Sequence, residues 1–136
     1  MRKALLLSIA MLLLLVAAPA YSQQVRKGFV LQDQASTGNG TPACLDSKTN
    51  STCFYITFGT ALAQVTAGSV SIETAPSANF TGTWAQLALV EVTDTGYFEY
   101  YVCTDGPIEC VRARIVDDIV AVGGGAGKVS VIVRSN

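Results

Sequence analysis

The chain has 136 residues, with nine basic side chains against ten acidic ones and no histidine. This length is enough for one domain and too short for two. The missing histidine excludes Ser-His-Asp and Cys-His catalytic sites and imidazole ligands for metals. Half of the residues are hydrophobic and only 14% are charged, but much of the apolar excess lies in the first twenty residues.

The N-terminal segment has the order of features that is typical of a secretory signal peptide. Two basic residues precede an apolar run over residues 4–18, and Pro19 and small residues follow it. Cleavage after Ala20 or after Ser22 fits this pattern, and the second is preferred, which assigns residues 1–22 to the signal peptide. The alternative is an uncleaved membrane anchor, because the apolar run is near the lower limit of about 17 residues for a bilayer span.

Removal of this segment would leave 114 residues with seven basic and ten acidic side chains, a net charge of −3. Nucleic acids and anionic membranes attract clustered positive charge, so neither is expected as a partner. Membrane contact is expected only through an uncleaved signal segment. The protein is therefore expected to be secreted, or to lie in the periplasm or at the cell surface.

The rest of the chain carries the pattern of short strands. A weak strand is expected over residues 28–32, and the polar, Gly- and Ser-rich residues 33–52 predict a loop. From Cys53 onward, apolar and polar residues alternate in short runs bounded by turn residues. These runs cover residues 54–58, 69–73, 86–89, 97–102, 111–115 and 129–134.

Six to eight short strands at this spacing predict an all-β fold, a single antiparallel β-sandwich or jelly roll. The expected organisation is a signal peptide over residues 1–22, an N-terminal strand and polar loop over 23–52, and the sandwich domain over 53–136. The expected core consists of the valines and the large aromatic residues Phe54, Phe58, Trp84 and Phe98. For Trp84 the alternative is an exposed platform for a ligand.

Four cysteines in an exported chain are expected to pair, and three pairings are possible. Cys44 and Cys53 bracket a polar loop of eight residues, whereas Cys103 and Cys110 bracket a turn between two strand-like runs. The expected bonds are therefore Cys44–Cys53 and Cys103–Cys110, each worth roughly 2–3 kcal/mol through loop closure. No CxxC pair is present, which argues against a zinc site or a redox role.

Tyrosines provide the main candidate binding surface. Tyr55, Tyr97 and Tyr101 lie opposite the apolar positions of their strands, so they form either an exposed aromatic face for a sugar or protein, or a second buried face. Arg112 and Arg114 form a close basic pair and are further candidates for binding, together with Trp84.

Other motifs are weak. Residues 123–128 read GGGAGK but lack the first Gly and the final Ser or Thr of a phosphate-binding loop, so a hairpin loop is expected there. Asp117 and Asp118, beside Asp94 or Glu91, lack the alternating spacing of a calcium loop. No spacing selects a pair of catalytic carboxylates. The sequence thus predicts neither an enzyme nor a metal or other cofactor.

Four short motifs cover much of residues 59–134: Ala67–Ile72, Phe80–Leu87, Val111–Arg114 and Lys128–Val133. Their pattern resembles a small β-sandwich module of phage tail and virion-associated proteins and of bacterial surface proteins. The resemblance implies a structural or adhesive role without catalytic residues. The signal peptide and the four cysteines depart from that pattern and favour a secreted cellular relative.

The sequence therefore leads to two expectations for function. The first is an exported, non-catalytic structural or adhesion module that binds a protein partner or associates with itself through exposed strand edges. The alternative is a carbohydrate-binding module that uses exposed tyrosine or tryptophan faces.

Overall fold

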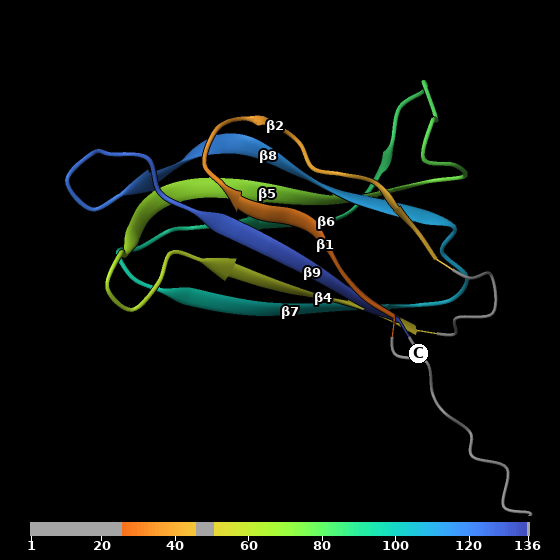
Figure 1. The fold of residues 1–136 in the computed structure, drawn as a ribbon, viewed down its shortest axis with the longest axis horizontal. Helices are drawn as coiled ribbons and strands as arrows, with labels where there is room; N and C mark the ends of the chain where they lie inside the picture. The colour runs from red at the N-terminus through yellow and green to blue at the C-terminus, as the bar shows by residue number, and fades with distance from the viewer. Residues whose placement is uncertain (1–25, 46–50, 136) are drawn as a thin grey trace, which may run out of the picture.

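The computed structural model describes residues 26–45 and 51–135, which form two antiparallel sheets packed face to face (Figure 1). The predicted all-β sandwich is thereby confirmed. The described residues contain no helix that is long and apolar enough to cross a membrane. The predicted signal peptide, residues 1–22, lies outside the described residues.

The first sheet has the strand order β1-β9-β4-β7. Its strands are β1 (Arg26–Gln34), β9 (Val129–Ser135), β4 (Ser51–Phe58) and β7 (Phe98–Asp105). Strand β1 is longer than the predicted strand over residues 28–32 and pairs with β9, so this part of the N-terminal region belongs to the sandwich. Two register shifts interrupt its pairing.

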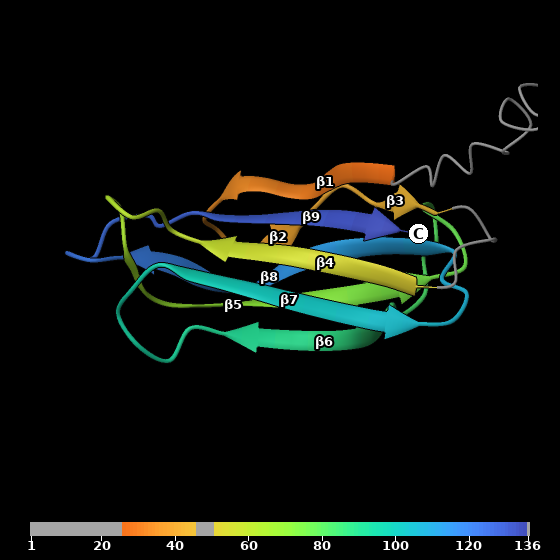
Figure 2. The ribbon, with the colours of Figure 1, turned by 90° about the horizontal axis from the view of Figure 1, so that it is seen from below.

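The second sheet has the order β2-β8-β5-β6, and β3 also pairs with β8. Its strands are β2 (Gly38–Asn39), β3 (Ala43–Cys44), β8 (Cys110–Ala121), β5 (Val65–Ala75) and β6 (Ala85–Glu91). The segment predicted as a loop thus contributes two very short strands to this sheet. In the view of Figure 2, β6 and β7 lie along the same side of the sandwich.

The chain passes between the sheets at almost every connection. Among the strands of residues 26–45 and 51–135, only β5 and β6 are consecutive and pair as a hairpin. The links β4–β5, β6–β7 and β8–β9 all join one sheet to the other. The Gly-rich segment predicted as a hairpin loop is the link from β8 to β9, in which Gly123 and Gly124 have positive φ. These φ values are in the left-handed region that glycine adopts without steric cost.

The core lies between the sheets because side chains alternate along each strand. Strand β4 shows the alternation fully: Phe54, Ile56 and Phe58 are completely buried, and the residues between them are only partly so. Burial of each such side chain stabilises the folded state by roughly 1.5–3 kcal/mol, because its apolar surface leaves water. Phe98 is partly buried against this core, whereas Trp84 lies in a separate cluster with Ala75 and Cys110. Trp84 is thus buried, as expected, but it packs in this smaller cluster rather than between the large aromatic residues of the main core.

The disulfides are Cys44–Cys110 and Cys53–Cys103, so the predicted pairing is wrong. Each bond joins residues that stand directly opposite on neighbouring strands, β3 with β8 and β4 with β7. Their Cα atoms are 3.9 Å and 4.1 Å apart. Cysteines that are close in the sequence lie in different sheets, because the chain changes sheets between them. Two intramolecular disulfides indicate an oxidising environment, outside the cell or in the periplasm.

Removal of the disulfide between β4 and β7 should destabilise the folded protein. The Cys53→Ala/Cys103→Ala variant is expected to lose about 4 kcal/mol of its free energy of unfolding, because the bond closes a long loop. The sequence separation of the two cysteines is 50 residues. Urea unfolding measures this loss. Peptide mapping without reduction is the companion measurement, and a peptide that joins Cys103 to Cys110 would contradict the structure.

Candidate functional site

The outer face of the first sheet carries a group of tyrosines, here called the tyrosine face: Tyr55, Tyr97, Glu99 and Tyr101. Tyr55 lies on β4, Glu99 and Tyr101 lie on β7, and Tyr97 directly precedes β7. Tyr55 stands opposite Tyr101 in the antiparallel register. Since the neighbours of these residues along each strand point into the core, their own side chains point to solvent. Of the two predicted arrangements, the structure has the exposed one.

The side chains of the tyrosine face contact one another. The rings of Tyr55 and Tyr101 stack with centroids 4.7 Å apart and planes inclined by 30°. The hydroxyls of Tyr55 and Tyr97 both donate hydrogen bonds to Oε1 of Glu99. Tyr101 nevertheless remains 69% exposed and Tyr97 40% exposed. The face thus combines accessible rings with a carboxylate that is held in a fixed orientation.

These hydrogen bonds shift the acidity of both partners. Donation from Tyr55 and Tyr97 stabilises the carboxylate and lowers the pKa of Glu99 below its usual 4.5. The hydrogen bond to Glu99, together with burial, raises the pKa of Tyr55 well above the usual 10. The same two causes raise the pKa of Tyr97. At neutral pH Glu99 is therefore ionised, and the phenols of Tyr55 and Tyr97 that bond it are neutral.

A pocket adjoins the tyrosine face and shares Tyr97 with it. Its other lining residues are mostly polar: Asp33, Thr57, Gly59, Thr60, Ala61, Lys128 and Ser130. Hydrogen bonds connect its walls, because the backbone N–H of Asp33 donates to Oγ of Ser130 at 3.0 Å. Thr57 stands opposite Glu99 in the sheet, so the pocket and the tyrosine face form one continuous surface.

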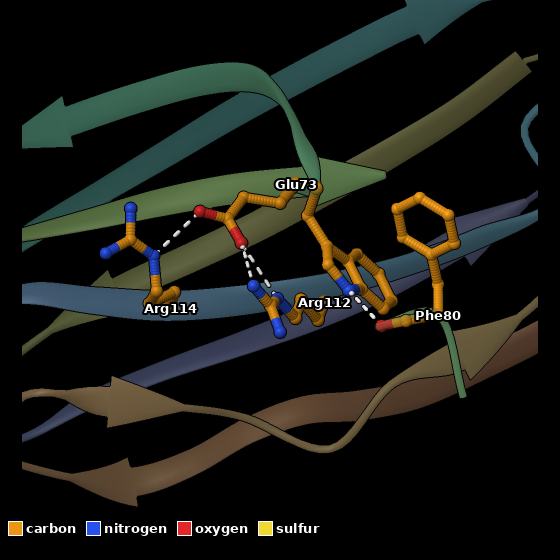
Figure 3. Close-up of polar contacts among 5 residues, drawn as sticks. Glu73, Phe80, Arg112 and Arg114 are labelled. Atoms are coloured by element: carbon orange, nitrogen blue, oxygen red, sulfur yellow. Dashed lines mark hydrogen bonds and ion pairs between the residues drawn. The ribbon is translucent and has the colours of Figure 1, made fainter. Parts of the chain in front are cut away.

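The outer face of the second sheet carries an arginine–glutamate cluster, formed by Glu73, Arg112 and Arg114 (Figure 3). Glu73 on β5 is only 4% exposed. Its Oε2 accepts from Nη2 and Nε of Arg112 at 2.8 Å, and its Oε1 accepts from Nε of Arg114 at 2.7 Å. Burial alone would raise the pKa of Glu73, but the two guanidinium groups outweigh it and lower that pKa below 4.5.

Trp84 completes the arginine–glutamate cluster. The guanidinium carbon of Arg112 lies 4.4 Å from the centre of the Trp84 ring, which is a cation–π contact. The indole N–H donates to the carbonyl of Phe80 at 3.3 Å (Figure 3). Trp84 is 7% exposed, so its ring covers Arg112 and offers no open platform to a ligand. The candidate binding residues on this sheet thus interact with one another.

Two aspartates considered for calcium instead hold loops and strands together. Oδ2 of Asp117 accepts from the hydroxyl of Ser69 at 2.6 Å, and Oδ1 of Asp118 accepts from the backbone N–H of Thr37 at 2.6 Å. Within residues 26–45 and 51–135, no group of three or more acidic or cysteine side chains is placed to hold a metal ion.

The sequence pattern by itself did not select Glu73 or Glu99 as site residues. A signal for Glu99 was present, because it lies two residues from both Tyr97 and Tyr101 and thus on the same face of the strand. The sequence indicated less about Glu73. Its spacing from Ser69 and Ser71 places it on the same face of the strand as those serines, but its arginine partners lie about forty residues further along the chain. That contact can be identified only when the pairing of β5 with β8 is known.

No family model matches the chain, and no curated protein matches its sequence. The four motifs that resemble a small β-sandwich module lie on β5, on the β5–β6 hairpin, on β8 and at the start of β9.

The ion pairs of Glu73 should contribute measurably to stability. Glu73→Gln is expected to lower the free energy of unfolding at neutral pH by about 2 kcal/mol. The loss is smaller than for a fully buried pair because Arg112 and Arg114 are partly exposed and their charges are screened by solvent. Thermal or urea unfolding measures it, and Glu91→Gln, which removes an exposed carboxylate from β6, is the matched control.

The stability difference between wild type and Glu73→Gln should also depend on pH. Because the pKa of Glu73 is lower in the folded state than the unfolded 4.5, its stabilising contribution is complete above pH 4.5 and decreases as the pH falls further. The stability difference between wild type and Glu73→Gln should shrink in that acidic range. A difference that grows as the pH falls would contradict the ion-pair assignment.

The tyrosine face makes a separate prediction for Glu99. Tyr55→Phe removes one of its two hydroxyl donors, so the pKa of Glu99 should rise toward 4.5. An NMR titration of the Glu99 side-chain carboxyl carbon measures this pKa. Tyr101→Phe is the control, because the two hydroxyls that bond Glu99 come from Tyr55 and Tyr97. Equal pKa values in wild type and Tyr55→Phe would contradict the observed network.

Proposed function

We propose that the protein is an exported, non-catalytic structural or adhesion module, and that copies of it associate through strand β6. The observation that carries the proposal is the edge that β6 presents. Within the described part of the chain, β6 pairs only with β5, so the backbone groups on its other side have no strand partner. Unpaired edges of this kind are ready templates for another strand.

The exposed side chains of β6 are unusually apolar for an edge. Leu87 is 36% exposed and Leu89 is 43% exposed. A groove beside them runs between β6 and the end of β7 and is lined by apolar residues that include Phe80, Pro107 and Ile108. Natural sheet edges usually carry charges, bulges or prolines that prevent pairing. Strand β6 has one bulge, after Gln86, and a single charged residue, Glu91.

The other edges are less suited to pairing. Strands β2 and β3 have two residues each, and two register shifts distort β1. The outward face of β7 carries the charged residues Glu99 and Asp105. Short, irregular and charged edges are the features that discourage association. This comparison favours β6 as the assembly edge.

The occupant of this edge is a second copy of the chain. Every strand pair in the structure is antiparallel, and an antiparallel contact between two β6 strands would be symmetric. In such a contact the two Glu91 carboxylates would lie at opposite ends, so no like charges would face each other. The leucines of the two copies would then lie beside one another across the contact, which reduces the apolar area that they expose to water.

Other features support a role outside the cell without catalysis. The predicted signal peptide and the two disulfides agree with export. The chain contains no histidine, and Glu73 and Glu99 are engaged by arginines and tyrosines rather than facing each other across a cleft. A structural or adhesive role requires only stable surfaces.

Sedimentation equilibrium of the purified mature protein tests the proposal. Wild type should show dimers or larger assemblies as its concentration rises. Leu89→Lys should weaken association by about tenfold or more, because pairing would bring the introduced charge against an apolar strand. Leu62→Lys places the same charge at a fully exposed leucine outside β6 and should associate like wild type. Wild type that stays monomeric at millimolar concentration would overturn the proposal.

A further inference from the structure

We infer that the tyrosine face and its adjoining pocket bind a neutral oligosaccharide chain. This site lies on the outer face of the first sheet and does not depend on association through β6. It combines three features that recognise a sugar: accessible aromatic rings, an oriented carboxylate, and an adjoining pocket whose lining includes hydroxyl and charged side chains.

The rings provide the apolar part of the contact. Tyr101 is the most exposed of the three tyrosines, and its stacking on Tyr55 fixes its ring against the sheet. The face of an aromatic ring carries partial negative charge and attracts polarised C–H groups, such as those on the flat face of a sugar. A ring that is already held in place loses little conformational entropy when a ligand binds.

The carboxylate provides the directional part. Oε1 of Glu99 accepts from the hydroxyls of Tyr55 and Tyr97, while Glu99 itself is exposed. A carboxylate has lone pairs on both oxygens, so Oε2 keeps its full capacity to accept hydrogen bonds from sugar hydroxyls. The two phenols keep the group ionised and fix its plane, which is the preorganisation that a polar contact needs.

The length of the site favours a chain of sugars over a single one. Tyr97 and Tyr101 are four residues apart along an extended segment, which corresponds to roughly 13 Å. The pocket extends the surface beyond Tyr97, and Lys128, Thr57 and Ser130 on its walls supply one donor and two hydroxyl groups. Such groups hydrogen-bond to hydroxyls without requiring a charged ligand.

Charge selects a neutral ligand over an acidic one. The tyrosine face holds Glu99, and the pocket holds Asp33 against the single cation Lys128. Carboxylates and phosphates on a ligand would be repelled by Glu99 at the centre of the site. A neutral polyhydroxylated chain meets no such repulsion.

Affinity electrophoresis in gels that contain soluble polysaccharides tests the inference. The neutral probes are a mixed-linkage β-glucan, a mannan, an arabinoxylan and soluble starch, and the acidic probe is polygalacturonate. At least one neutral polymer should retard the wild-type protein more than polygalacturonate does. Lack of retardation by all four neutral polymers, or retardation by polygalacturonate alone, would overturn the inference.

Variants of the tyrosine face then locate the site. Tyr101→Ala should weaken binding by about tenfold, since it removes the main exposed ring, whereas Tyr101→Phe keeps the ring and should bind nearly as wild type. Glu99→Gln should also weaken binding. Val122→Ala removes an exposed apolar side chain from the link between β8 and β9, outside both proposed surfaces, and is the control. Equal retardation of Tyr101→Ala and wild type would refute the site.

Two sets of measurements distinguish a loss of sugar binding from a loss of folding and from a loss of self-association. Circular dichroism and the unfolding midpoint should be unchanged in Tyr101→Ala, because that side chain is largely exposed. The Leu89→Lys variant should still bind the polysaccharide, and Tyr101→Ala should still associate with itself. Loss of sugar binding in Leu89→Lys would show that binding depends on assembly and would overturn an independent site on the first sheet.

Discussion

The structure depends on the two-residue period of β4, a strand that lies inside the first sheet between β9 and β7. Its inward side chains Phe54, Ile56 and Phe58 are fully buried, and its outward Tyr55 reaches the tyrosine face. A shift of one residue in register would exchange the two sets and expose three large apolar side chains. The energy that buries the core therefore also determines which side chains the outer face presents.

This dependence explains what the sequence alone was able to predict. Alternation is a local property of each strand, so the strands and the sandwich class followed from runs such as residues 54–58 and 129–134. The neighbour of each strand is a long-range property. Because most links join one sheet to the other, cysteines that are close in the sequence are far from being strand neighbours, and the pairing by shortest loop was wrong.

The same distinction applies to the candidate site. The positions of Tyr97 and Tyr101 on one exposed face follow from their even spacing along β7 and the residue that precedes it. The contact of Glu99 with Tyr55 requires the register of β7 against β4, which brings together residues 44 positions apart. Likewise, the even spacing of Arg112 and Arg114 places both on one face of β8, but only the register of β5 identifies Glu73 as their common partner.

The two proposed surfaces belong to different sheets, and this separation has a consequence for adhesion. Pairing of two copies at β6 would extend the second sheet and leave both tyrosine faces on the outside of the first sheets. Two sites on one particle bind a polymer with a high effective concentration for the second contact, and avidity then exceeds single-site affinity by about 10²–10⁴-fold. A shallow face with a few exposed rings provides only a modest affinity by itself. Association at a strand edge would convert that modest contact into firm attachment to a surface that repeats the same sugar.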